Sequence, residues 1–191
     1  MTETDICNLA LDILKERPIA SIDDARPTAE WCKRNFAITR DGCLSMANWN
    51  FAMKRQKLAA EAAAPAFDWS YAYTVPIDCI RVVALTEGGR PEGRPIAHVV
   101  EGGAILTNQS GPLPVRYVRR ITSYDAYHPL FIEALSARLA FKGAHWITGK
   151  TSYQQIAKGI YDQAINDAWL TDAIEGDQPR AADNNWIDAR Y

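Results

Sequence analysis

Three histidines and four cysteines are the residues whose types could bind a metal ion or act as a nucleophile with its base. A zinc site needs ligands at short, regular spacings such as C-x-x-C or H-x-x-x-H. No such spacing occurs, and no histidine lies beside a cysteine, among His98, His128, His145, Cys7, Cys32, Cys43 and Cys79. The pattern favours structural roles for the histidines and buried free thiols for the cysteines.

Paired carboxylates could support glycoside hydrolysis, which needs two of them at a suitable separation. Asp23 and Asp24 fall in an expected loop between two helices, and Glu133 falls near the start of a later helix. Capping of the loop and complementarity to the helix dipole account for these positions without catalysis. The chain also lacks a G-x-S-x-G elbow. We expect no catalytic, cofactor-binding or metal-binding residues, and no enzyme.

Two basic segments could recognise phosphate. The run GGRPEGRP at 88–95 lacks the spacing of a P-loop, and its prolines favour a hairpin loop. Arg116, Arg119 and Arg120 could serve a nucleic-acid module, but they alternate between the two faces of one expected strand without an aromatic platform. The net charge of −2 and pI near 5.9 provide no global positive field. General nucleic-acid binding is therefore not expected.

Four helices are expected to position these residues. Apolar residues at helical spacing predict a first helix over residues 4–16, capped by Thr4, and a second over 28–47 after Pro27. A third helix should begin at Pro129 and end at Gly149. Thr151 and Gln154 form a candidate capping box for a fourth, reaching about residue 174. Its inner face is expected to carry Tyr153, Ile156, Ala157, Ile160 and Ala164.

Between the second and third helices, period-2 alternation predicts strands over residues 49–53, 71–75, 80–85, 96–108 and 115–121, with a turn at Gly102-Gly103. At the Pro76-Ile77-Asp78 corner, Asp78 is expected to cap free turn amides. The predicted fold is α+β: an antiparallel bundle of about four helices with an inserted antiparallel β-module and an extended tail. The helical part comprises residues 1–47 and 125–175, the module 48–124 and the tail 176–191.

Length and charge bound the organisation further. With 191 residues and 48% hydrophobic content, the chain can bury a core without disulfides or metals. Its acidic start and lack of a long apolar run predict neither a signal peptide nor a membrane span, and hence a cytosol-like site of synthesis. Residues 48–124 hold nine basic and six acidic side chains, whereas 160–191 hold two basic and seven acidic ones. The acidic end is either a solvated tail or an electrostatic contact surface.

Aromatic residues provide the remaining candidates for binding. The chain has six tryptophans, and those expected in core or interface positions are Trp31, Trp49, Trp69, Trp146 and Trp169. Trp186, Ile187 and Tyr191 instead lie in the polar tail. Aromatic anchors in a segment that orders on binding can form a specific interface. The alternatives are that this tail binds another protein or that it packs on its own domain.

Several segments in order carry a resemblance to a known family: a helical pair, WNFA at 49–52, YAYTVPIDCIRV at 71–82, VEGGAILT at 100–107, VRYVRR at 115–120, FIEALSARLA at 131–140 and ITG at 147–149. Together they resemble the tail tubular protein A family of short-tailed phages, which are head-to-tail adaptors. The resemblance runs through nearly the whole chain. Each segment alone would be a weak signal.

The resemblance implies a structural virion protein, assembled in the host cytoplasm. Twelve copies would form a ring between the portal protein and the tail nozzle protein, and the genome DNA would pass through without specific binding. It further implies that the helices build the ring, that the β-module faces the tail, and that the C-terminal segment with Trp186, Ile187 and Tyr191 reaches the portal. Neither a cofactor nor a membrane is implied. The alternative is a tail-associated, cell-wall-modifying (muralytic) accessory protein.

Overall fold

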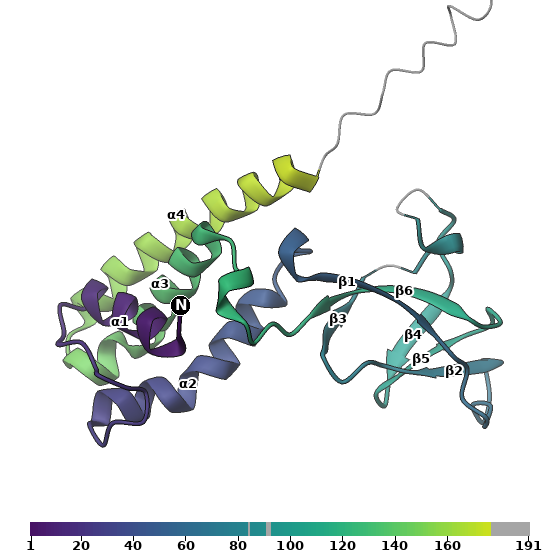
Figure 1. The fold of residues 1–191 in the computed structure, drawn as a ribbon, viewed down its shortest axis with the longest axis horizontal. Coiled ribbons are helices and arrows are strands. Elements are labelled where there is room, and N and C mark those ends of the chain that lie inside the picture. The colour runs from purple at the N-terminus through teal and green to yellow at the C-terminus, as the bar shows by residue number, and fades with distance from the viewer. Residues whose placement is uncertain (84, 91–92, 177–191) are drawn as a thin grey trace, which may run out of the picture.

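The computed structural model of the chain describes residues 1–83, 85–90 and 93–176. Over these ranges the protein is mixed α and β, with helices α1 (Glu3–Ile13), α2 (Pro27–Leu44), α3 (Pro129–Thr148) and α4 (Thr151–Gly176). Six strands between α2 and α3 form two small antiparallel sheets. Figure 1 shows the helices at one end of the molecule and the strands at the other.

Helix boundaries follow local capping chemistry. Pro27 and Pro129 occupy the first turns of α2 and α3, and Gly149 ends α3 in the left-handed conformation at φ 67°, as predicted. The prediction that Thr4 caps α1 is wrong. Thr2 is the N-cap, and it forms a reciprocal capping box with Asp5. Thr151 is likewise not a cap, because it is already the first residue of α4.

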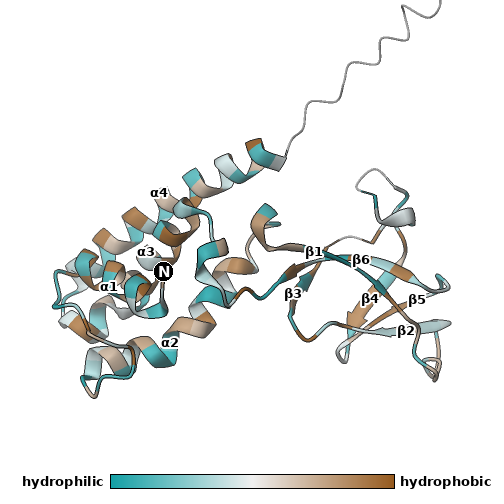
Figure 2. Ribbon diagram, viewed as in Figure 1, coloured by the Kyte–Doolittle hydropathy of each residue, from teal (hydrophilic) through white to brown (hydrophobic). Residues whose placement is uncertain are grey.

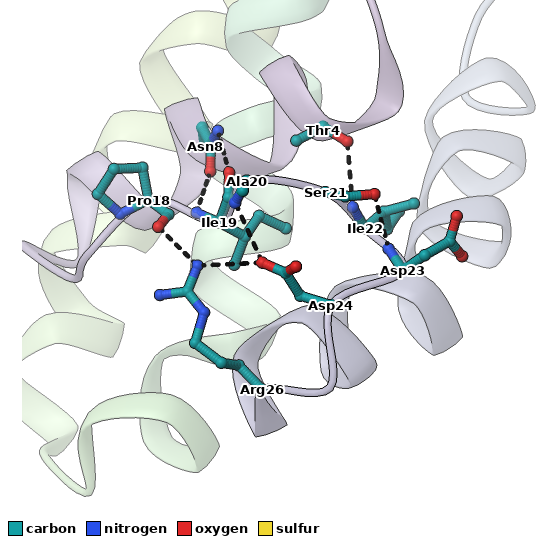
Figure 3. Close-up of polar contacts among 10 residues, drawn as sticks. All are labelled: Thr4, Asn8, Pro18, Ile19, Ala20, Ser21, Ile22, Asp23, Asp24 and Arg26. Atoms are coloured by element: carbon teal, nitrogen blue, oxygen red, sulfur yellow. Dashed lines mark hydrogen bonds and ion pairs between the residues drawn. The ribbon is translucent and has the colours of Figure 1, made fainter.

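The connection between α1 and α2 is held by side chains bonded to backbone groups. The amide of Asn8 bridges both polar backbone groups of Ile19, and the hydroxyl of Thr4 accepts from the Ile22 N–H at 3.2 Å (Figure 3). Arg26 donates to the Pro18 carbonyl oxygen at 2.7 Å and contacts Asp24. These side chains therefore satisfy backbone groups of the connection that would otherwise have to bond to water.

The first sheet has the order β1-β6-β3, from β1 (Met53–Leu58), β6 (Leu113–Arg119) and β3 (Cys79–Val82). The second has the order β2-β5-β4, from β2 (Tyr71–Thr74), β5 (Ala104–Thr107) and β4 (His98–Glu101). The β4–β5 hairpin turns at Gly102 and Gly103, both at positive φ, as the sequence predicted. Thr86 and Pro95 form an isolated antiparallel bridge, and next to it the Glu87 N–H donates to the Arg94 carbonyl oxygen.

One predicted strand is placed wrongly. Residues Asn50–Ala52 form a 3-10 turn, and the strand β1 begins only at Met53. The alternation of Trp49 and Phe51 with polar residues reflects turn packing, because Trp49 is buried and its indole N–H donates to the Cys43 carbonyl oxygen at 3.0 Å. The true strand MKRQKL has polar side chains on both faces over most of its length, so period-2 hydropathy does not reveal it.

Two buried clusters form the core. The larger lies among the helices and includes residues of all four, with α3 contacting each of the other three. The smaller lies between the sheets around Tyr73, Ile105 and Tyr117. Strand β6 contributes to both, because successive side chains point to opposite faces: Tyr117 enters the sheet cluster and Val118 the helical one.

Asp78 has a different role from the predicted one. Its carboxylate accepts hydrogen bonds from Lys54 Nζ at 2.8 Å and from the Tyr117 hydroxyl at 2.9 Å. The corner itself is closed by the backbone, where the Cys79 N–H donates to the Pro76 carbonyl oxygen. Asp78 thus ties β1, β6 and the corner before β3 together, and the expectation that it caps turn amides is corrected.

No helix in the described part of the chain combines the length and the hydropathy needed to cross a membrane.

Candidate functional site

The histidines take the positions that the sequence indicated. His98 lies in β4 with its Nδ1 2.7 Å from the Ile96 carbonyl oxygen, and His128 is the N-cap of α3, where its ring accepts from the Leu130 N–H. His145 lies in the last turn of α3. Across residues 1–83, 85–90 and 93–176, no three His, Cys, Asp or Glu side chains come together as a possible metal site.

Three cysteines are buried, and Cys79 is half-buried. Burial raises the pKa of Cys43 to about 11, although the nearby Arg138 guanidinium opposes this shift. Its thiol is therefore held in the protonated, unreactive form. Cys7 and Cys32 face each other, and this contact together with burial raises the pKa of Cys7.

Of the three candidate carboxylates, Asp23 and Glu133 are exposed, and Asp24 is half-buried and accepts from the Ala20 N–H and from Arg26. Asp23 pairs with Lys33 at 2.7 Å, and its N–H bonds to the Ser21 hydroxyl. Glu133 lies on an exposed position of α3. None of the three lines any of the pockets described below.

The tryptophans divide between core and surface. Trp31 and Trp49 are buried as expected, whereas Trp146 and Trp169 are 50% and 38% exposed. Trp146 stacks on Trp31 with ring centroids 6.5 Å apart, so it covers the helical cluster from outside. Trp186, Ile187 and Tyr191, the predicted portal contacts, lie outside the described residues.

Helix α4 carries an exposed apolar stripe, here called the α4 stripe. It consists of four residues that are each at least 41% exposed: Ile156, Ile160, Leu170 and Ile174. At about 100° per residue they fall within roughly 80° of one another around the helix. They form two pairs, Ile156 with Ile160 and Leu170 with Ile174, and the exposed polar residues Gln163 and Asp167 lie on the same face between the pairs. Figure 2 shows hydrophobic segments alternating with hydrophilic ones along α4 to its far end. Aligned exposed aliphatic side chains on one helix are typical of a protein–protein contact.

The opposite side of α4 fixes the helix to the rest of the protein. Ala157, Ile165 and Ala168 are its buried residues. Near its end, Asp172 accepts from the Asn50 N–H at 2.8 Å, and the Asn50 side chain donates back to the Asp172 carbonyl oxygen. Burial raises the pKa of Asp172, and this hydrogen bond opposes the shift. The α4 stripe is therefore presented on a helix anchored along its length.

A second surface is a groove of about 1130 Å³ on the outer face of the second sheet. Its floor is formed by strand residues such as Ala72, Leu106 and Val99, and its wall by the alanine-rich segment 63–69. That segment is tied to the sheet where the Thr74 hydroxyl donates to Glu61 at 2.8 Å. Phe67, 78% exposed, stands at the wall.

No protein-family model matches the chain, and no curated protein matches it. The α4 stripe is the stronger candidate site, because it combines exposed aliphatic side chains with a rigid, anchored helix. Sequence analysis placed Ile156 and Ile160 on the inner face of the fourth helix. In the structure Ile156 and Ile160 are exposed, so this part of the prediction is wrong. Ala157 is buried as predicted, and Ile165 is buried as well.

Proposed function

We propose that this protein is a structural virion protein, a head-to-tail adaptor that forms a ring between the portal and the tail nozzle and surrounds the DNA exit channel. The proposal starts from the resemblance to the tail tubular protein A family in the segments quoted above. The observation that carries it is the α4 stripe, in which four aliphatic side chains are exposed to solvent on a helix whose other side is packed against the rest of the protein. Their burial requires another molecule.

A closed ring supplies such a partner. Each subunit of a ring contacts its neighbours through two different surfaces, so a stripe on one side meets another surface of the next copy. Burying a fully exposed Ile or Leu side chain contributes about 1.5–3 kcal/mol, and these side chains, 41–76% exposed, would contribute a corresponding fraction of it. Four such side chains per contact are a substantial part of what ring closure needs, and the contact repeats around the axis.

The finer arrangement belongs to the same proposal. The four helices act as an antiparallel bundle that builds a ring of twelve copies, and the strands of residues 48–124 face the nozzle. Trp186, Ile187 and Tyr191 contact the portal from the C-terminal segment. The ring resides in the virion at the head–tail junction, after assembly in the host cytoplasm.

Co-sedimentation with the portal of its own phage, followed by imaging of the complex, tests this function. The wild-type chain should give a stoichiometric ring on the portal. Leu170→Glu together with Ile174→Glu should leave the monomer folded and abolish ring closure. Ile77→Glu is the matched control, because Ile77 is 97% exposed but lies outside the α4 stripe.

A wild-type chain that is folded and does not associate with an intact portal would refute the adaptor proposal. Equal ring formation by the stripe variant and the control would refute the role of the α4 stripe. The muralytic alternative gains no supporting observation, since Asp23 is engaged by Lys33 and Glu133 lines no described pocket.

A further inference from the structure

A small pocket of about 230 Å³ lies at the first sheet, and none of its lining residues belongs to the α4 stripe. Strands β1 and β6 contribute Arg55, Lys57 and Arg116, and the short turn after β3 contributes Gly88 and Gly89. This brings together the two segments that sequence analysis considered for phosphate recognition and set aside. Neither segment, taken by itself in the sequence, predicted that the other would lie beside it.

The three cations share one face of the sheet. Arg55 and Arg116 are direct cross-strand partners, and Lys57 pairs with Pro114 two residues along. Like charges opposite each other destabilise a sheet. Among the described residues none of the three forms an ion pair, and the neighbouring acid Glu87 lines a different pocket. The sheet therefore carries a cluster of positive charges that does not stabilise the sheet.

Two arginine nitrogens strengthen this point. The Nε atoms of Arg116 and of Arg81 are buried, and in the described part of the chain they have no hydrogen-bond acceptor. Of the two, Arg116 lines the pocket; Arg81 pairs in register with Val118, two residues along β6, and its guanidinium donates to the Asn48 side chain. A buried donor of a charged group without an acceptor costs free energy, so such atoms call for a missing acceptor.

The glycine turn closes the pocket by close approach. Gly88 and Gly89 have φ of 67° and 69°, a conformation that side chains rarely adopt. A Cβ on Gly89 would lie 3.0 Å from the Cβ of Pro114. A side chain at Gly89 would crowd Pro114, so backbone rather than a side chain lines this part of the pocket.

We propose that this pocket binds a phosphate group, either as the free ion or as a phosphodiester of nucleic acid. Guanidinium groups match phosphate oxygens in a bidentate geometry. The free phosphate ion carries up to two negative charges near pH 7 and a phosphodiester carries one, so either ligand would balance part of the three positive charges. The pocket volume accommodates one such group. The inference goes beyond the adaptor role and does not depend on it.

The full chain, labelled with nitrogen-15, is titrated with sodium phosphate at constant ionic strength and, separately, with a short DNA duplex. Saturating shifts of the Gly88 and Gly89 amide signals are expected with at least one of the two. Arg116→Gln and Arg55→Gln should each weaken that binding by about tenfold or more. Arg34→Gln, which removes one charge from an exposed position of α2, is the matched control and should leave it unchanged.

Response to phosphate identifies the free ion as sufficient, and response to the duplex alone identifies the phosphodiester. Arg55 is exposed, so its variant stays informative if Arg116→Gln fails to fold. Whichever ligand shifts the glycine signals should also raise the melting temperature of the wild type at constant ionic strength, and Arg55→Gln should lose this difference. The proposal is overturned by unmoved glycine signals in both titrations or by equal binding of Arg55→Gln and Arg34→Gln.

Discussion

The side-chain amide of Asn8 forms two hydrogen bonds with the backbone of Ile19, accepting from its N–H at 2.8 Å and donating to its carbonyl oxygen at 3.0 Å (Figure 3). Asn8 lies on α1, and Ile19 lies in the connection to α2 with its side chain buried in the helical cluster. One side-chain amide therefore satisfies both polar backbone groups of Ile19, as a neighbouring strand would, and holds its side chain in the helical cluster.

Replacing Asn8 by Ala should lower the free energy of unfolding by about 2–3 kcal/mol, because two partly buried backbone groups lose their partners. Asn8→Asp should also destabilise, since a carboxylate can accept from the Ile19 N–H but cannot donate to its carbonyl oxygen. Urea denaturation monitored by circular dichroism measures both. Gln163→Ala, at an exposed position of α4, is the control and should change stability by less than about 0.5 kcal/mol. Equal stability of Asn8→Ala and the control would show that water replaces the amide without loss.

Two helical glycines should respond to alanine with opposite signs. A Cβ on Gly143 in α3 would lie 2.8 Å from Ile147 Cδ1 and 2.9 Å from the Trp31 ring, whereas one on Gly159 in α4 would meet nothing within 4 Å. Gly143→Ala should destabilise by about 1–3 kcal/mol through overpacking. Gly159→Ala should stabilise by about 1 kcal/mol, because alanine favours the helix. Thermal melting of the two variants beside wild type distinguishes them. A higher melting temperature for Gly143→Ala would mean that Trp31 and α3 can move apart at little cost in free energy.

Acid should weaken the protein in part through Asp78. Partial burial alone would raise the pKa of Asp78, but hydrogen bonds from Lys54 and Tyr117 outweigh it and lower the pKa below its ordinary value. A lowered folded-state pKa contributes stability that is present above the unfolded pKa, near 4, and is lost as the pH falls through the folded value.

In Asp78→Asn this contribution is absent at every pH. The difference in unfolding free energy between wild type and the variant should therefore be largest near pH 7 and shrink below about pH 4. Urea denaturation at a series of pH values measures it. A difference that stays constant down to pH 2 would contradict the role of the ionised carboxylate.

Amide substitutions separate the two functions considered for the chain. Glu133→Gln and Asp23→Asn should leave ring formation on the portal unchanged, because both side chains are exposed and lie outside the α4 stripe. Digestion of purified peptidoglycan provides the second readout. Digestion by wild type that both substitutions abolish would instead support the muralytic alternative.

Local sequence determined most helix boundaries. Proline at the first turn and glycine at the left-handed end act within a few residues, so Pro27, Pro129 and Gly149 could be interpreted without the rest of the fold. The β4–β5 hairpin follows from its two glycines for the same reason. The cap of α1 was misplaced by two residues, because Thr2 and Thr4 both suit that role and Thr4 bonds to Ile22 instead.

Only the tertiary structure decided which residues meet. Arg55 and Arg116 become partners through strand register. Gly89 lies against Pro114 although more than twenty residues separate them in the sequence. Likewise, the inner face of α4 is set by how the helix packs on α3, which a helix with apolar residues on several sides does not specify. Capping and turn preferences are local energies, whereas register and helix rotation depend on burial across the whole chain. The sequence alone thus determined where most elements begin and end, and the packing of distant segments determined the α4 stripe and the cationic pocket.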